Sequence, residues 1–169
     1  MKLQLYFLDF DGVFCPNLLK SLNTSHISQE DFAKEVQKYT ELNQILIQNL
    51  QFLSHSLTNV RFYIFTGRKV SLLKDWTENL LKKYGILVLF SEILYYPEAL
   101  GYNPSDYYNW KLKILLKFKK QFKNADFHIF DDDQKLLGFL HQKLQSLTSI
   151  NLIYYEYFEN GTIMIQKNF

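Results

Sequence analysis

The stretch Leu5–Val13 reads LYFLDFDGV, an apolar run of strand length that ends in two carboxylates on either side of one residue, followed by a glycine. A short apolar run that is rich in aromatic residues and bounded by a turn signal predicts a strand buried on both faces. Buried strands of parallel sheets present binding groups at their carboxyl ends. We therefore expect Asp9 and Asp11 at a reactive edge of a sheet, with Gly12 allowing the backbone to turn sharply away.

Two carboxylates this close together raise each other's pKa and call for a positive partner. A hard divalent cation with oxygen ligands, typically Mg²⁺, is a common solution in proteins. An isolated Asp-x-Asp also fits a turn or a cap for the following segment. Asp9 and Asp11 alone leave both interpretations open, so the rest of the chain has to decide.

A second strand is predicted at Val60–Phe65, and it ends in Thr66-Gly67-Arg68. A hydroxyl and backbone N–H groups beside a glycine are typical of a nest that binds an anion. An arginine such as Arg68 can contact phosphate through two of its nitrogens. Gly67 and Arg68 are therefore candidates for substrate binding. The alternative is a plain strand-to-helix turn capped by Thr66.

A helix over about residues 106–123 carries one lysine on its apolar side. At about 100° per residue, the apolar residues span roughly 140° of this helix, and Lys111 falls in the middle of that stripe. A lysine on the core side needs a negative partner, which the carboxylates and a bound phosphate would supply. Lys113 is the alternative if the helix starts differently. The stripe consists of Trp110, Ile114, Leu115, Phe118 and Phe122.

A further buried strand at Phe127–Phe130 runs directly into three aspartates, Asp131, Asp132 and Asp133. An acidic N-cap for the following helix explains one of these carboxylates, or at most two. At least one carboxylate at this strand end is therefore not explained by capping.

In this order along the chain, the motifs resemble those of the haloacid dehalogenase-like (HAD) superfamily. That superfamily has an apolar strand with Asp-x-Asp-Gly-Val, a threonine or serine ending a second strand, a lysine opening a later helix, and an acidic pair ending another strand. The resemblance covers essentially the whole chain, and it extends to the compact HAD domains of RNA- and DNA-end repair. The matching residues are Asp9 to Val13, Thr66, Lys111, and Asp131 with Asp132, while Asp133 is ambiguous.

The resemblance implies a Mg²⁺-dependent phosphatase that hydrolyses a phosphomonoester in two steps. Asp9 attacks phosphorus and forms an aspartyl-phosphate. Asp11 protonates the leaving oxygen and later activates water. Thr66 and Lys111 bind phosphoryl oxygens in the transition state. Asp11, the implied general acid, favours phosphate chemistry over dehalogenation.

The same resemblance implies a metal site of Asp9, Asp11 through its backbone carbonyl, and Asp131 or Asp132. Mg²⁺ in that place offsets the charge of the nucleophile and of the phosphate. A function of a different class is a non-catalytic module that keeps the acidic pocket to bind a metal or nucleic acid. A lysine-rich helix is compatible with such binding, although lysines of this kind usually form a solvated face.

The alternation of strands and helices favours a doubly wound α/β fold, a three-layer sandwich around a mainly parallel sheet. We expect a single HAD-like domain over residues 1–169, without a large cap but with a small helical insert at about 17–39. The other strands are expected at Ile86–Phe90, extended by Ile93–Tyr96, and in a C-terminal hairpin of Leu152–Phe158 and Thr162–Gln166 at one edge of the sheet.

Composition sets the remaining limits. The chain has 169 residues, 47% of them hydrophobic, and a net charge of +2, which suits one globular domain and neither favours nor excludes nucleic acid. No apolar run approaches the roughly 20 residues needed to cross a bilayer, which excludes the transport ATPases of the superfamily. The single cysteine, Cys15, fits a reducing compartment, so we expect a cytoplasmic protein. Cys15 is better explained as a small buried hydrophobe than as a nucleophile.

The substrate class is left open by the sequence. A phosphorylated partner is implied, either a small molecule or a nucleic-acid end, and the oligomeric state is not indicated. The resemblance implies that specificity lies in loops and caps, here residues 14–39 and 91–108. The loop Pro97–Ser105 should pass near the site, with Tyr102, Tyr107 and Tyr108 available to line it.

Overall fold

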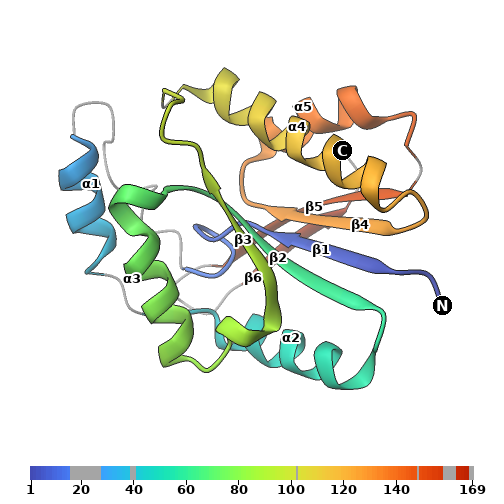
Figure 1. The fold of residues 1–169 in the computed structure, drawn as a ribbon, viewed down its shortest axis with the longest axis horizontal. Helices are drawn as coiled ribbons and strands as arrows, with labels where there is room; N and C mark the ends of the chain where they lie inside the picture. The colour runs from blue at the N-terminus through green and yellow to red at the C-terminus, as the bar shows by residue number, and fades with distance from the viewer. Residues whose placement is uncertain (16–27, 39–40, 102, 148, 158–162, 168–169) are drawn as a thin grey trace.

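The computed structural model describes residues 1–15, 28–38, 41–101, 103–147, 149–157 and 163–167. In this part of the chain, six strands form one sheet in the order β3-β2-β1-β4-β5-β6 (Figure 1). The strands are β1 (Gln4–Leu8), β2 (Val60–Lys69), β3 (Phe90–Tyr96), β4 (Asp126–Asp131), β5 (Ile150–Tyr157) and β6 (Ile163–Lys167). The helices are α1 (Gln29–Val36), α2 (Gln44–Ser56), α3 (Val70–Lys83), α4 (Pro104–Gln121) and α5 (Gln134–Leu144).

Helices cover both faces of the sheet. α2 and α3 pack on one face, α4 and α5 on the other, and α1 packs against α3 (Figure 1). β1 to β5 are parallel, and only β6 is antiparallel to its neighbour among the described strands. The chain proceeds outward from β1 to β3, then crosses back to place β4 and β5 on the other side of β1. The structure thus confirms the predicted doubly wound α/β sandwich.

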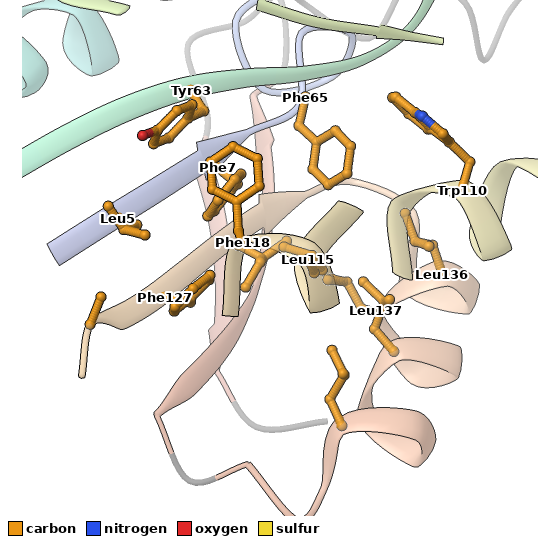
Figure 2. Close-up of a cluster of buried hydrophobic side chains, with 14 of the residues drawn as sticks. Leu5, Phe7, Tyr63, Phe65, Trp110, Leu115, Phe118, Phe127, Leu136 and Leu137 are labelled. Atoms are coloured by element: carbon orange, nitrogen blue, oxygen red, sulfur yellow. The ribbon is translucent and has the colours of Figure 1, made fainter. Parts of the chain in front are cut away.

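β1 is buried on both faces, as its apolar sequence predicts. Its residue Phe7 lies in the cluster beneath α4 and α5, whereas Leu8 faces the opposite cluster. The Phe7 ring stacks on Tyr63 of β2 at 5.0 Å and on Phe127 of β4 at 5.7 Å, and it meets the edge of Phe118 of α4 at 5.1 Å (Figure 2). These aromatic contacts join three neighbouring strands to α4 and so fix where α4 lies on the sheet.

The predicted strand at Ile86–Phe90 is wrong. Leu87–Leu89 forms a 3₁₀ turn, and β3 begins only at Phe90, the last residue of the predicted strand, and runs through the expected extension to Tyr96. Gly85 adopts a left-handed conformation with φ +67 after α3. Ile86 then enters the core, but Val88 is 88% exposed. A short apolar run cannot be assigned to a strand by periodicity alone, and here the run includes a surface turn.

The predicted C-terminal hairpin is confirmed at the edge of the sheet, where β5 and β6 pair antiparallel. Its turn falls within residues 158–162, outside the described residues. Within the predicted insert at 17–39, the structure describes α1, which starts with the Ser28 Oγ accepting a hydrogen bond from the Asp31 N–H at 3.1 Å. Residues 17–27 and 39 lie outside the described ranges, so the insert stays a prediction. Among the described residues, the helices are too short or too polar to span a membrane.

Candidate active site

The predicted motifs meet at the carboxyl ends of β1 and β4, where the strand order reverses. Leu8 of β1 lies opposite Phe130 of β4, and the Asp9 N–H donates to the Phe130 carbonyl oxygen at 2.9 Å. Asp9 and Asp131 therefore leave adjacent strands at the same level. Loops diverge at such a switch point and leave a crevice, which is where open α/β sheets bind their ligands.

Asp9, Asp131 and Asp132 form an acidic cluster in which one carboxylate oxygen from each lies within 4.8 Å of the others. Lys111 lies between two of them, donating from Nζ to Asp9 Oδ1 at 2.9 Å and to Asp131 Oδ2 at 2.6 Å. Asp9, Asp131 and Lys111 are buried, so solvent screens their charges only weakly. A single ammonium, that of Lys111, is thus shared by two buried carboxylates.

Burial and the neighbouring charges shift the pKa values of Asp9 and Lys111. Burial raises the pKa of the Asp9 carboxyl well above its usual range, Lys111 opposes this shift, and Asp131 and Asp132 reinforce it. Burial lowers the pKa of Lys111, but the carboxylates of Asp131 and Asp9 outweigh it and raise that pKa above its usual value. Lys111 therefore keeps its charge. A divalent cation beside the carboxylates would favour the ionised form of Asp9.

The residues of the acidic cluster fit a hard cation such as Mg²⁺. All of the side-chain donors are carboxylate oxygens, which Mg²⁺ and Ca²⁺ prefer. Gly12 makes room for the third of them, because a Cβ built on Gly12 would lie 2.2 Å from Asp132 Cγ. Gly12 also has φ +79, a conformation that other residues rarely adopt. The glycine of the first motif therefore serves the acidic cluster as well as the turn.

Asp133, which the sequence left ambiguous, is the N-cap of α5. Its Oδ1 accepts hydrogen bonds from the N–H groups of Lys135 at 2.9 Å and Leu136 at 3.0 Å. Its Oδ2 accepts a hydrogen bond from the Tyr108 hydroxyl at 2.8 Å. One of the three consecutive aspartates is thus used for capping, and Asp131 and Asp132 form the acidic pair beside Asp9.

Asp11 points away from the acidic cluster and pairs with Arg68. Arg68 donates from Nε to Asp11 Oδ2 at 3.0 Å and from Nη2 to Asp11 Oδ1 at 2.7 Å. Its Nη1 donates to Thr77 Oγ1 at 3.0 Å. The guanidinium lies 4.2 Å from the Phe10 ring centroid and 4.7 Å from that of Trp76. The bidentate contact that we expected Arg68 to make with phosphate is made here with Asp11.

Thr66 and Gly67 lie where β2 departs from regular pairing. β2 extends to Lys69, beyond the predicted end, and its register with β3 shifts between Thr66 and Lys69. Such an irregularity redirects side chains, and it places Gly67 and Arg68 on the wall of a pocket. Thr66 is fully buried, and its hydroxyl accepts the Arg68 N–H at 3.2 Å. Two groups of the expected anion-binding nest, the Thr66 hydroxyl and the Arg68 N–H, are therefore bonded to each other in this structure.

A pocket of about 330 Å³ opens beside Asp9 and Asp11. Tyr107 and Tyr108 line it, as predicted, whereas Tyr102 lies outside the described residues. The structure also places Asn103 and Pro104 on the wall, because α4 begins at Pro104 with Asn103 as its N-cap. A local signal for this start was available, since asparagine is favoured at the N-cap and proline at the first helical position.

The orientation of α4 brings Lys111, and not Lys113, to the acidic cluster. Lys111 is 1% exposed and enters the acidic cluster, whereas Lys113 is exposed on the other side of the helix. Trp110 fixes this rotation by meeting the edge of Phe65 of β2 at 4.9 Å. The predicted position of Lys111 on the apolar stripe is confirmed, and its role toward a phosphoryl group stays a prediction.

Cys15 is buried next to the site, and its thiol is neutral. Burial raises the pKa of Cys15 to about 12, with Arg68 opposing the shift. A nucleophilic cysteine requires a lowered pKa. The interpretation of Cys15 as a small buried hydrophobe is therefore favoured.

Three solved structures are similar to this chain over most of its length. The HAD domain of the effector protein Lem4 from Legionella pneumophila has 16% identity and a TM-score of 0.56, over 89% of this chain and 84% of that one. An inactive mutant of the same domain has 14% identity and a TM-score of 0.57, over 92% and 87%. A hydrolase from Streptococcus pneumoniae has 12% identity and a TM-score of 0.55, over 90% and 92%.

No protein-family model matches the chain, and no curated protein sequence matches it. At the identities of the three structures, the likeness shows the fold alone. The chain has a HAD-like fold, as its motifs predicted. What such a fold does depends on the residues of its site.

Proposed function

We propose that this protein is a Mg²⁺-dependent hydrolase of phosphomonoesters that acts through an aspartyl-phosphate on Asp9. The observation that carries the proposal is the position of Asp9. It borders the pocket and also belongs to the acidic cluster, in which three carboxylates lie close together and two of them share Lys111. A carboxylate with a metal on one side and a substrate pocket on the other has the two neighbours that a phosphoryl-transfer nucleophile needs.

In the first step, an Asp9 carboxylate oxygen attacks phosphorus, and the bond from phosphorus to the leaving oxygen breaks. Asp11 donates a proton to that oxygen. Both oxygens of Asp11 accept hydrogen bonds from Arg68 in the resting structure, so Asp11 has to release at least one of them to reach the leaving group. Lys111 holds Asp9 in place and offsets the charge that develops on the phosphoryl oxygens.

In the second step, Asp11 takes a proton from water, and the water oxygen attacks the phosphorus of the aspartyl-phosphate. The bond between phosphorus and Asp9 breaks, which releases phosphate and restores the carboxylate. Asp9, Asp131, Asp132 and the backbone carbonyl of Asp11 would hold Mg²⁺, which when bound offsets the charge of the nucleophile and of the phosphate.

Two substrate classes are compatible with the pocket. Its volume of about 330 Å³ is at the lower end for small-molecule sites. Lys113, Lys117 and Lys120 are exposed on α4, whose first turn lies at the pocket wall, and they favour a polyanion such as a nucleic-acid end. Dependence of KM on salt separates these classes, because only the polyanion loses affinity steeply as salt rises.

The proposal is tested by phosphate release from p-nitrophenyl phosphate and from a 3′-phosphorylated oligonucleotide, each with Mg²⁺ and with a chelator. We expect Mg²⁺-dependent release from at least one substrate and no release by an Asp9→Asn variant. Release that persists with the chelator would contradict the proposed metal dependence. Absence of release from both, and from a wider panel of phosphomonoesters, would contradict the phosphatase itself.

A non-catalytic metal-binding module is the second candidate. It is favoured by one observation, the engagement of both Asp11 oxygens by Arg68, which also donates to Thr77. The phosphatase and the non-catalytic module would both bind a metal, but only the phosphatase would turn over a substrate. Metal binding therefore has to be measured separately from activity.

We expect Mg²⁺ to raise the melting temperature of the protein, because a ligand that binds only the folded state stabilises it. At 100 times the dissociation constant the gain is about 2.7 kcal/mol. Differential scanning fluorimetry in Mg²⁺ and in chelator measures this shift in melting temperature. Asp131→Asn should lose the shift, whereas Asp126→Asn, at the other end of β4 and paired with Lys2, should keep it. Equal melting temperatures in Mg²⁺ and chelator would contradict a metal site.

A further inference from the structure

Tyr107 is the pocket residue whose hydroxyl faces the nucleophile. Its oxygen lies 3.4 Å from Asp9 Oδ1, the same atom that Lys111 contacts at 2.9 Å. Tyr107 and Lys111 are four residues apart in α4, so they project from the same face of the helix. The ring of Tyr107 packs over Gly67, where an added Cβ would approach its Cε2 to 3.3 Å. Gly67 of β2 thus leaves room for the Tyr107 ring, and α4 and Gly67 together position the Tyr107 hydroxyl.

The other side-chain donors on the pocket wall make shorter hydrogen bonds, to partners other than Asp9. Arg68 donates to Asp11 and Thr77. The Tyr108 hydroxyl donates to Asp133, and the Asn103 amide donates to Asp106 at 2.5 Å. Tyr107, by contrast, makes a long contact of 3.4 Å, which is easily exchanged for a better acceptor.

The two donors expected from the sequence do not reach the pocket in this structure. Thr66 and Lys111 are almost completely buried, and neither is among the residues that line it. Thr66 Oγ1 accepts the Arg68 N–H, and Lys111 is held by two carboxylates. Unlike these two side chains, Tyr107 lines the pocket beside Asp9.

We propose that the Tyr107 hydroxyl donates a hydrogen bond to an oxygen of the transferred phosphoryl group and strengthens that bond as charge develops in the transition state. This inference rests on the proposed function. A phenol has an ordinary pKa of about 10, so it keeps its proton and acts as a donor at neutral pH. Contacts of catalytic groups are often long before substrate binds and shorten in the complex. Tyr107 is then a catalytic residue of the pocket, not only part of its wall.

The test compares Tyr107→Phe with Tyr63→Phe. Both changes remove one oxygen and keep the ring. Tyr63 is buried in the core beneath α4, stacked on Phe7 and away from the pocket lining (Figure 2). We expect kcat to fall on the order of 10²-fold in Tyr107→Phe, as for the loss of one donor to a transition-state oxyanion. The expected change in KM is small, and Tyr63→Phe should retain the wild-type kcat.

Orthovanadate mimics a pentacoordinate phosphoryl group. Its dissociation constant is a measurement that a change in packing alone would not alter. Its dissociation constant in the presence of Mg²⁺ should rise for Tyr107→Phe by a factor similar to the loss in kcat, and it should not change for Tyr63→Phe. The melting temperature of each variant reports on the fold. Equal kcat and equal vanadate affinity in the two variants would overturn the inference, whatever the melting temperatures.

Failure of the proposed function is distinguishable from failure of this inference. A wild-type protein without turnover would contradict the phosphatase, and the vanadate comparison would still decide on Tyr107. Weaker binding by Tyr107→Phe alone would support the hydroxyl as an anion donor. Equal binding by both variants, or no binding by the wild type, would overturn that role.

Discussion

Asp9→Asn is expected to abolish turnover and leave the fold intact. Asparagine has the shape of aspartate, but its amide does not attack phosphorus, so no covalent intermediate forms. Removal of a covalent nucleophile lowers kcat on the order of 10⁴-fold or more. Phosphate release under single-turnover and steady-state conditions measures the loss.

Asp9→Asn is expected to lose activity but to keep or gain stability. Without metal, the change removes one of the two buried carboxylates that share the Lys111 ammonium, and Lys111 keeps its 2.6 Å contact with Asp131. The metal-free variant should therefore melt at or above the wild-type temperature, and Mg²⁺ should stabilise it less. A loss of activity accompanied by a lower melting temperature would point to misfolding, whereas activity within tenfold of the wild type would require another nucleophile.

Lys111→Met is expected to damage both activity and stability. Methionine fills a similar volume, but it leaves Asp9 and Asp131 buried without their shared ammonium. Removing one partner of a buried ion pair costs about 3–5 kcal/mol. kcat should fall on the order of 10²- to 10³-fold because an electrostatic contact to the reacting groups is lost. Lys113→Met, two residues along α4 and exposed, is the matched control and should behave as the wild type.

The stability defect of Lys111→Met is expected to depend on pH. Burial already raises the pKa of Asp9, and Lys111 is the influence that lowers it. In the variant, the folded state then holds protons that the unfolded chain, with carboxyl pKa values of about 4, releases. The defect should therefore be small near pH 4 and grow as the pH rises toward neutrality. Urea unfolding at several pH values, without Mg²⁺, measures it. A defect that is independent of pH would indicate lost packing in place of unpaired charge.

Features encoded by short-range patterns were predictable from the sequence. β1 and β4 are apolar runs that end in carboxylates, and the parallel sheet brings those ends together. The rotation of α4 follows from its apolar stripe, which is why Lys111 could be chosen over Lys113. The strand at Ile86–Phe90 was wrong because an apolar run at the edge of a sheet carries no clear period, and Gly85 starts a surface turn there.

Features that depend on long-range pairing were not predictable. Arg68 and Asp11 are 57 residues apart, and nothing in either local sequence indicates that one binds the other in place of phosphate. The same holds for the Tyr107 hydroxyl and Asp9, 98 residues apart. The sequence placed Tyr107 near the site, but which of several adjacent tyrosines faces the nucleophile depends on the exact rotation and start of α4.

The two carboxylates of the first motif are neighbours in sequence but are anchored in opposite layers of the sandwich. Asp9 is held by Lys111 and Tyr107 of α4, on one face of the sheet. Asp11 is held by Arg68, which is bonded to Thr77 and stacked on Trp76, both in α3 on the other face. The Asp11 side chain is therefore oriented by packing on the α3 face of the sheet, and the Asp9 side chain by contacts on the α4 face. A substitution in α3 that releases Arg68 is expected to change the position of the Asp11 carboxylate more than that of Asp9.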